Sequence, residues 1–214
     1  MRPGRPPKFD RDTAILEAAR LFWRHGYAGT STRALSGSLG MSTSSIYAAF
    51  GSKAGLFELA VRTYAERYRT IYRQALAEPD FAVALAELFR RSVEEFTQPS
   101  SGHPGCLVSS AALTDKPDTI DIRAYLEDLY SDNKRLLRTR IERAQRDGQL
   151  PVSIEPAALA LSLQAVWHGL SAQSNFGHPR ADLQQAADIL ISGLLTRQGS
   201  TGVKKSLAEA QQHL

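Results

Sequence analysis

The sequence has almost no cysteine, since Cys106 is the only one among 214 residues. A single cysteine excludes an intramolecular disulfide framework and any metal site built from several cysteines. No apolar run reaches the ~18–20 residues that a membrane-spanning helix needs, and the N-terminus lacks the apolar core of a signal peptide. No strand pattern of useful length and no internal repeat occurs. We therefore expect a cytoplasmic all-α protein without cofactor or metal.

The sequence also lacks the motif of a hydrolase nucleophile. Ser109 or Ser110 with His103 is the one combination that resembles a nucleophile and its base. Neither serine lies in a G-x-S-x-G motif, and the chain order suggests no acid–histidine–nucleophile set. We expect no enzymatic activity.

The positive charge of the chain is concentrated near its N-terminus. Residues 1–53 hold eight Lys or Arg against three Asp or Glu, whereas the remainder holds eighteen against nineteen. This distribution is typical of a nucleic-acid-binding segment followed by a near-neutral domain. Residues 1–9 contain three prolines and a glycine, which prevent a helix. Gly4-Arg5-Pro6 matches the core of minor-groove AT-hook peptides, so we expect a flexible basic arm that places Arg5 in a minor groove. A disordered basic tail is the alternative.

Residues 31–53 predict two short helices joined by a tight turn, the helix-turn-helix pattern. The first helix is expected over Thr32–Ser38 and the second over Thr43–Phe50. Gly40 forms the corner, because only glycine enters the left-handed region without a penalty. Ser42 then offers its side-chain oxygen to the free N–H groups that open the second helix.

The polar side chains of this stretch are those expected to contact DNA. The second helix opens with small polar residues at the end that a recognition helix inserts into a major groove. Tyr47 points away from the apolar stripe of Ile46 and Phe50, and Lys53 lies where its ammonium can meet a backbone phosphate. A structural hairpin whose serines only face solvent is the alternative. The expected DNA contacts are Arg5, Thr32, Arg33, Ser42, Thr43, Ser44, Ser45, Tyr47 and Lys53.

Residues 10–57 resemble the DNA-binding domain of the TetR family of transcriptional regulators. The resemblance rests on A-I-L-E-A-A-R-L-F-W-R-H-G-Y-A-G-T-S and on the following L-S-x-x-L-G-M-S-x-x-x-I-Y-x-x-F-x-S-K-x-x-L-F. The chain departs from the usual family pattern at Ser36, Ser44, Ala49 and Ala54. Ala49 removes a backbone contact to DNA and Ser44 adds a hydroxyl near the bases, so the resemblance implies the binding mode but no operator sequence.

The apolar periodicity predicts about nine helices. A first helix over 10–25, ended by Gly26, packs on the helix-turn-helix and completes a three-helix DNA-binding domain over 10–52. A helical ligand-binding and dimerisation domain follows over 53–197, and a polar tail over 198–214. The later helices are expected at 53–76, 81–96, 106–114, 117–147, 156–176 and 180–195.

The last two expected helices are the least polar part of the chain, and such a pair needs a partner surface. In proteins of the TetR family the last two helices of each subunit form a four-helix dimer interface. The resemblance therefore implies a homodimer, whereas the apolar content only permits one. It also implies a repressor that binds a palindromic double-stranded operator, with half-sites roughly 34–36 Å apart per helical turn.

A dimeric regulator of this kind changes its conformation with the distance between its two recognition helices. Its ligand must bind the conformation with one distance better than the conformation with another. We expect a small-molecule site between the middle helices of the second domain, where aromatic walls and a few polar groups occur together. Plain core packing is the alternative for each side chain, and for His168 in particular. The expected lining is Phe89, Phe96, Cys106, Leu107, Ser110, Tyr125, Leu129, Trp167 and His168.

Cys106 supports a different hypothesis about the signal. It lies at the predicted N-terminus of a short helix, three residues after His103, and both features lower a thiol pKa and favour the reactive thiolate. Cys106 is therefore a candidate redox or electrophile sensor, with a small buried hydrophobe as the alternative. A ligand-independent DNA-binding protein is a third hypothesis.

Overall fold

The computed structural model describes residues 10–97, 107–108 and 122–196, and the regular structure within these ranges is helical. The expected all-α fold is confirmed. The arm with Arg5, the residues Cys106 and Ser110, most of the expected helix over 106–114 and the polar tail lie outside the described residues. The helices are α1 (Arg11–Gly29), α2 (Thr32–Leu39), α3 (Thr43–Phe50), α4 (Lys53–Ala77), α5 (Phe81–Phe96), α7 (Ile122–Arg146), α8 (Pro156–Asn175) and α9 (Arg180–Thr196).

The first helix is interrupted at Gly26, where the sequence predicts its end, although α1 extends to Gly29. Asp10 caps α1 by accepting a hydrogen bond from the Asp12 backbone N–H at 3.1 Å. Gly26 has a φ of 68° inside the span assigned to α1, so the regular helix is interrupted there. The buried Thr30 hydroxyl donates to the Gly26 carbonyl at 2.7 Å, and this bond holds the residues that follow the interruption in place.

Helices α1, α2 and α3 enclose a small apolar core that also includes the start of α4. Phe22, Leu35 and Ile46 are buried together, as the sequence predicts for a three-helix unit. Phe57 of α4 meets the Phe22 ring edge-on at a centroid distance of 5.0 Å. Two turns further along α4, the Tyr64 ring meets Trp23 edge-on at 5.4 Å. Because α4 supplies part of this core, the first three helices are firmly attached to it.

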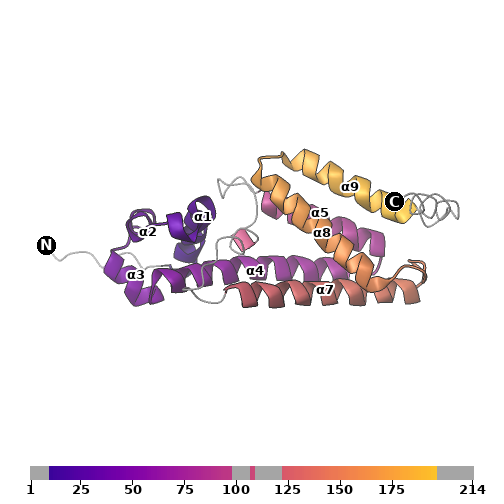
Figure 1. Ribbon diagram of the computed structural model, residues 1–214, viewed down its shortest axis with the longest axis horizontal. Helices are drawn as coiled ribbons and strands as arrows, with labels where there is room; N and C mark the ends of the chain where they lie inside the picture. The colour runs from indigo at the N-terminus through magenta and orange to yellow at the C-terminus, as the bar shows by residue number, and fades with distance from the viewer. Residues whose placement is uncertain (1–9, 98–106, 109–121, 197–214) are drawn as a thin grey trace, which may run out of the picture.

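Helix α4 connects the two ends of the molecule. Figure 1 shows it running from the α1–α3 cluster into the bundle formed by α5, α7, α8 and α9. In that bundle α5 packs on α4, α8 and α9, while α7 packs on α4 and α8. Helix α4 is therefore one continuous helix that contacts both the α1–α3 cluster and the bundle.

The turn between α4 and α5 is held by one side chain of α7 and one from the turn that follows it. Arg140 is buried and donates to the carbonyl oxygens of Glu78 at 3.1 Å and Pro79 at 2.8 Å. The Gln149 amide donates to the Pro79 carbonyl at 3.0 Å and accepts from the Phe81 N–H at 2.8 Å. Burial lowers the pKa of Arg140, which remains a cation because arginine titrates so far above neutrality.

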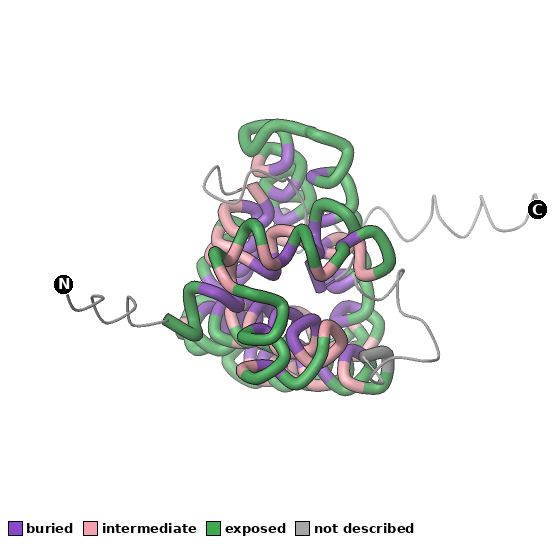
Figure 2. Tube along the Cα trace, turned by 90° about the vertical axis from the view of Figure 1, so that its left-hand side faces the viewer, coloured by how far each residue is buried: buried purple, intermediate pink, exposed green. Residues whose placement is uncertain are grey.

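The outer faces of α8 and α9 leave large apolar side chains exposed. Leu161 of α8 is 56% exposed, and Ile189 and Leu190 of α9 are 65% and 50% exposed. Figure 2 looks onto the end that carries α1–α3 and shows the buried residues gathered where helices face one another. Within the described residues, no helix combines the length and the apolar character needed to cross a bilayer.

Candidate nucleic-acid interface

The turn between α2 and α3 has the geometry that its sequence predicts. Ser31 caps α2 by accepting from the Ala34 N–H at 3.1 Å. Gly40 follows with a φ of 62°, in the left-handed region where glycine is favoured. The Ser36 hydroxyl donates to the Met41 carbonyl across the turn. Ser36 stands where the family pattern usually has alanine, and the extra hydroxyl thus braces the corner between the two helices.

A cluster of hydroxyl groups opens α3. The Ser42 Oγ caps the helix by accepting from the Ser45 N–H at 3.1 Å. The same oxygen lies 2.9 Å from the Ser44 hydroxyl and 2.8 Å from the Ser45 hydroxyl. Ser42 therefore holds the end of α3 in shape and orients two neighbouring hydroxyls. All three serines, and Thr43 beside them, are exposed.

The other residues expected at DNA lie in the first turn of α2, on α3 and at the start of α4. Arg33 is exposed and Thr32 is half-buried, both in the first turn of α2. Tyr47 of α3 is 43% exposed, which agrees with its predicted position away from the stripe of Ile46 and Phe50. The Lys53 Nζ lies 4.3 Å from the centroid of the Tyr27 ring, at the start of α4. Lys53 is thereby positioned by a cation–π contact rather than left to move freely.

Sequence reasoning did not single out Arg11, which lies beside the C-terminal end of α3. Its guanidinium lies over the Phe50 ring, at 5.7 Å from the ring centroid, so a cation of α1 adjoins the end of α3. In the sequence Arg11 is one of eight basic residues near the N-terminus. Nothing in the sequence around Arg11, in the first turn of α1, indicates that the fold brings this residue next to α3.

Phe96, Trp167 and His168 of the expected ligand lining come together in the second domain. The Trp167 indole N–H donates to the Ser92 Oγ at 2.8 Å, and its ring meets Phe96 edge-on at 5.0 Å. His168 packs edge-on against Tyr130 at 4.7 Å and against Trp167 at 5.1 Å. Burial lowers the pKa of His168, because its charged form would lose hydration among these rings.

The remaining described members of that set lie in different places. Tyr125 is half-buried against α4, with the Arg62 and Arg69 guanidinium carbons 4.2 and 5.6 Å from its ring centroid. Leu107 and Leu129 are buried. Phe89 faces a small apolar groove of about 130 Å³ between α5, α8 and α9. The other residues of this groove are Leu159, Ser162, Leu163, Val166, Ala187, Leu190, Ile191 and Leu194.

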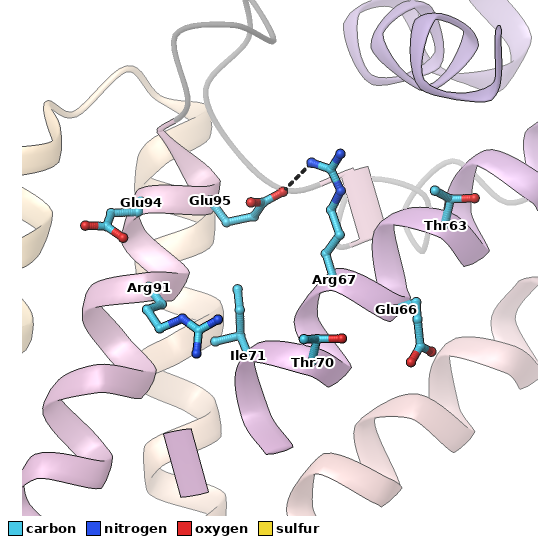
Figure 3. A pocket seen from close by; sticks show the side chains of 8 residues that line it. All are labelled: Thr63, Glu66, Arg67, Thr70, Ile71, Arg91, Glu94 and Glu95. Carbon is cyan, nitrogen blue, oxygen red and sulfur yellow. Dashed lines mark hydrogen bonds and ion pairs between the residues drawn. The ribbon is translucent and has the colours of Figure 1, made fainter. Parts of the chain in front are cut away.

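A larger groove lies between α4 and α5, and sequence reasoning named none of its residues. Its volume is about 710 Å³, and Figure 3 shows its side chains. No motif marks it, because it is formed by two helices that are each regular. Among the described residues, no three His, Cys, Asp or Glu side chains are grouped so that they could hold a metal ion.

Comparison with known proteins agrees with this geometry. The sequence profile described as "Bacterial regulatory proteins, tetR family" matches residues 15–60, which span α1 to the start of α4. The chain is 31% identical over 186 residues to the HTH-type transcriptional repressor ComR of Escherichia coli (strain K12), covering 86% of this chain and 88% of that protein.

Solved structures show the same likeness over nearly the whole chain. A cysteine-substituted form of the TetR family transcriptional regulator CifR, complexed with 26-base-pair double-strand operator DNA, is 37% identical with a TM-score of 0.77. The match covers 87% of this chain and 98% of that one. A TetR regulator from Rhodococcus sp. RHA1 is 33% identical with a TM-score of 0.59, over 86% and 99% of the two chains. The capped helix-turn-helix, the helical second domain and these full-length relatives together place the chain in the TetR family of transcriptional regulators.

Proposed function

We propose that this regulator represses transcription as a homodimer that inserts α3 of each subunit into the major groove of a double-stranded operator. The observation that carries the proposal is the capped start of α3, where Thr43 and Ser44 stand exposed beside the α2–α3 turn. CifR is complexed with operator DNA through a chain of the same fold, and ComR is a repressor. A small molecule bound in the second domain then releases the operator.

The residues of the interface divide into backbone contacts and base contacts. Tyr47, Lys53 and Thr32 hold the phosphate backbone, where contacts position the protein without reading sequence. Arg33, Thr43 and Ser44 reach base edges, and Ser42 and Ser45 keep the start of α3 in shape for them. Arg5 of the basic arm contributes a minor-groove contact beside the same half-site.

Base readout by α3 itself depends on hydroxyl and methyl groups. Helix α3 contains no Arg, Lys, Asn or Gln, and Arg33 is the only charged side chain in α2 and α3 together. The bidentate contacts that α3 side chains commonly make to guanine and adenine are therefore not available from this helix. Threonine and serine can bond to either base of a pair, and threonine also packs on the thymine methyl group. We expect Arg33 to supply the strongest single base contact.

The direct test is binding to the DNA that flanks the protein's own gene, measured over a series of salt concentrations. We expect saturable binding of a dimer that survives competitor DNA and weakens steeply with salt. Arg33→Ala should lower operator affinity by roughly tenfold or more, since a good base contact contributes about 1–3 kcal/mol. Arg24→Ala, an equally exposed arginine on α1, is the matched control and should bind as the wild type does. Failure to bind any DNA at low salt would contradict the proposal.

The signal that releases the operator has two candidate routes. The aromatic cluster around Phe96, Trp167 and His168 supports a small-molecule site among the middle helices. The sequence around Cys106 supports a thiol that reacts with oxidants or electrophiles. Measuring operator release by hydrogen peroxide in the wild type and in Cys106→Ser separates them. Equal release in both proteins would remove the thiol route.

A further inference from the structure

The groove between α4 and α5 has the size of a small-molecule site. Its volume of about 710 Å³ lies within the ~300–1,000 Å³ typical of ligand pockets. Helix α4 forms one wall and α5 the other, and Figure 3 shows the Arg91 guanidinium extending from α5 towards α4, next to Ile71. The lining residues are Thr63, Glu66, Arg67, Thr70 and Ile71 of α4 with Arg91, Glu94 and Glu95 of α5.

Each carboxylate that lines the groove already has a guanidinium partner. Glu95 is bonded by Arg67 at 3.0 Å across the groove, and its side chain is only 11% exposed. Glu94 is bonded by Arg90 at 2.7 Å, on the same helix. Glu66 is paired with Arg69 at 3.5 Å and Arg73 at 3.4 Å. A cationic ligand would therefore have to displace existing ion pairs before it could bind.

Arg91 has a different set of partners. Within the described part of the chain its hydrogen bond is to the neutral Gln74 amide oxygen, at 2.7 Å, and it forms no ion pair. The groove and its ion-pair partners contain five guanidiniums and four carboxylates, which leaves one positive charge in excess. The guanidiniums are those of Arg67, Arg69, Arg73, Arg90 and Arg91, and the carboxylates those of Glu66, Glu87, Glu94 and Glu95. Arg91 is the guanidinium of this set that has no described carboxylate within ion-pair distance, although its charge also acts on Glu87 one turn earlier in α5.

We propose that this groove binds a small organic monocarboxylate whose carboxylate group is held by Arg91 and whose apolar body lies against Ile71. A planar guanidinium with five donors matches a carboxylate in a bidentate arrangement, and its bond to Gln74 leaves donors for one. The Thr63 and Thr70 hydroxyls on the α4 wall are further hydrogen-bonding groups. The site thus selects for a single negative charge on an otherwise uncharged molecule.

The position of the groove connects its occupant to DNA binding. Its α4 wall belongs to the helix whose first turns carry the α1–α3 core through Phe57 and Tyr64. The Arg67–Glu95 ion pair ties that wall to α5. A ligand between the two helices changes how α4 rests on α5, and the change reaches α3. This regulatory role rests on the proposed function, whereas binding of the carboxylate itself does not.

The test uses 4-phenylbutyrate as probe and 4-phenylbutyramide as its neutral counterpart, each titrated into the full chain by isothermal calorimetry. We expect the carboxylate to bind saturably and the amide at least tenfold more weakly. Arg91→Gln should weaken binding of the carboxylate by a similar factor, and Arg91→Lys by less, because the charge is kept. Arg135→Gln, an exposed arginine of α7 outside the groove, is the matched control and should bind as the wild type does.

Three results would overturn the proposal. They are no saturable binding of 4-phenylbutyrate to the wild type, equal binding of the amide, and unchanged binding by a folded Arg91→Gln protein. Operator affinity without the probe is measured for the same proteins, and Arg91→Gln should keep it. Loss of operator binding by every protein, the wild type included, would count against the proposed repressor and not against the carboxylate site, which the calorimetry tests on its own.

Discussion

At the scale of single residues, Ser42 caps α3 and is also expected to face DNA. The substitutions Ser42→Ala and Ser42→Asp test these two roles separately. The Ser42 Oγ caps α3 through the Ser45 N–H, so Ser42→Ala should destabilise the protein by about 1 kcal/mol. A change of that size lowers the Tm by about 2–4 °C in a chain of this length. Ser38→Ala, an exposed serine at the end of α2, is the control and should leave the Tm within error.

The same position also tests whether the start of α3 faces DNA. Ser42→Asp keeps a capping oxygen, so its Tm should stay near that of the wild type. Its added negative charge should nevertheless weaken operator binding, because phosphates repel it. Normal operator affinity in a Ser42→Asp protein would mean that this end of α3 does not approach the DNA backbone.

His168 makes stability depend on pH in a direction that the structure fixes. Because burial lowers its pKa, the folded protein binds fewer protons than the unfolded chain below the ordinary histidine pKa of about 6.5. Stability from the neutral ring is therefore intact above that pH and is lost as the pH falls below it. We expect the Tm of the wild type to drop more between pH 8 and pH 5.5 than that of His168→Gln.

The quantity to compare is the pH slope rather than the Tm itself, since His168→Gln also loses its contacts with Tyr130 and Trp167. His178 is exposed after the end of α8, and His178→Gln should retain the wild-type slope. Parallel slopes for the wild type and His168→Gln would show that the ring takes up protons freely in the folded state.

At the scale of elements, the turn between α4 and α5 depends on a side chain far away in sequence. Gln149 accepts from the Phe81 N–H at 2.8 Å and donates to the Pro79 carbonyl at 3.0 Å. Gln149→Ala removes the acceptor of the Phe81 N–H, whereas the Pro79 carbonyl keeps its bond from Arg140. The substitution should cost about 1–3 kcal/mol of unfolding free energy. Urea unfolding with an unchanged m-value would measure it. Gln173→Ala, an exposed glutamine of α8, should leave the midpoint unchanged.

Helix ends could be predicted from the sequence, whereas contacts between helices could not. Gly26 and Gly40 stop their helices by a local preference for positive φ, and Ser42 caps α3 by reaching a donor three residues away. Arg140 is one of several arginines near the end of its helix, where the sequence predicts only a favourable charge at a C-terminus. It is instead buried against the α4–α5 turn, because the packing of α7 on α4 brings it there.

The candidate site divides in the same way. The polar residues around α3 follow from a short motif and a resemblance. The structure leaves them exposed, and their contacts with DNA stay a prediction. The groove that contains Arg91 exists because α4 and α5 diverge along their length. The apolar periodicity of the two helices does not encode the distance between them. The expected ligand lining mixed residues that do meet, such as Phe96 and Trp167, with others that the fold places elsewhere. Phe89 is buried beside the small groove of α5, α8 and α9, and Tyr125 is half-buried against Arg62.

At the scale of the whole molecule, the exposed apolar faces of α8 and α9 are the surface expected to join two subunits. Leu161 and Ile189 are more than half exposed in the single chain, and large apolar side chains left exposed on two packed helices are typical of an interaction site. An aspartate placed there would be buried without a partner in the dimer. The double substitution Leu161→Asp with Ile189→Asp should therefore give a monomer, measured by sedimentation equilibrium.

Operator binding by that variant tests whether both subunits are needed for full affinity. A monomer has one α3 and one half-site, so affinity for the complete operator should fall by well over tenfold while the helical circular dichroism is retained. Val152→Asp adds the same charge at a residue that is 84% exposed between α7 and α8, and it should remain a dimer with normal affinity. A double variant that still sediments as a dimer would place the interface elsewhere. A monomer that kept full affinity would show that one α3 is sufficient, which the hydroxyl-only chemistry of that helix argues against.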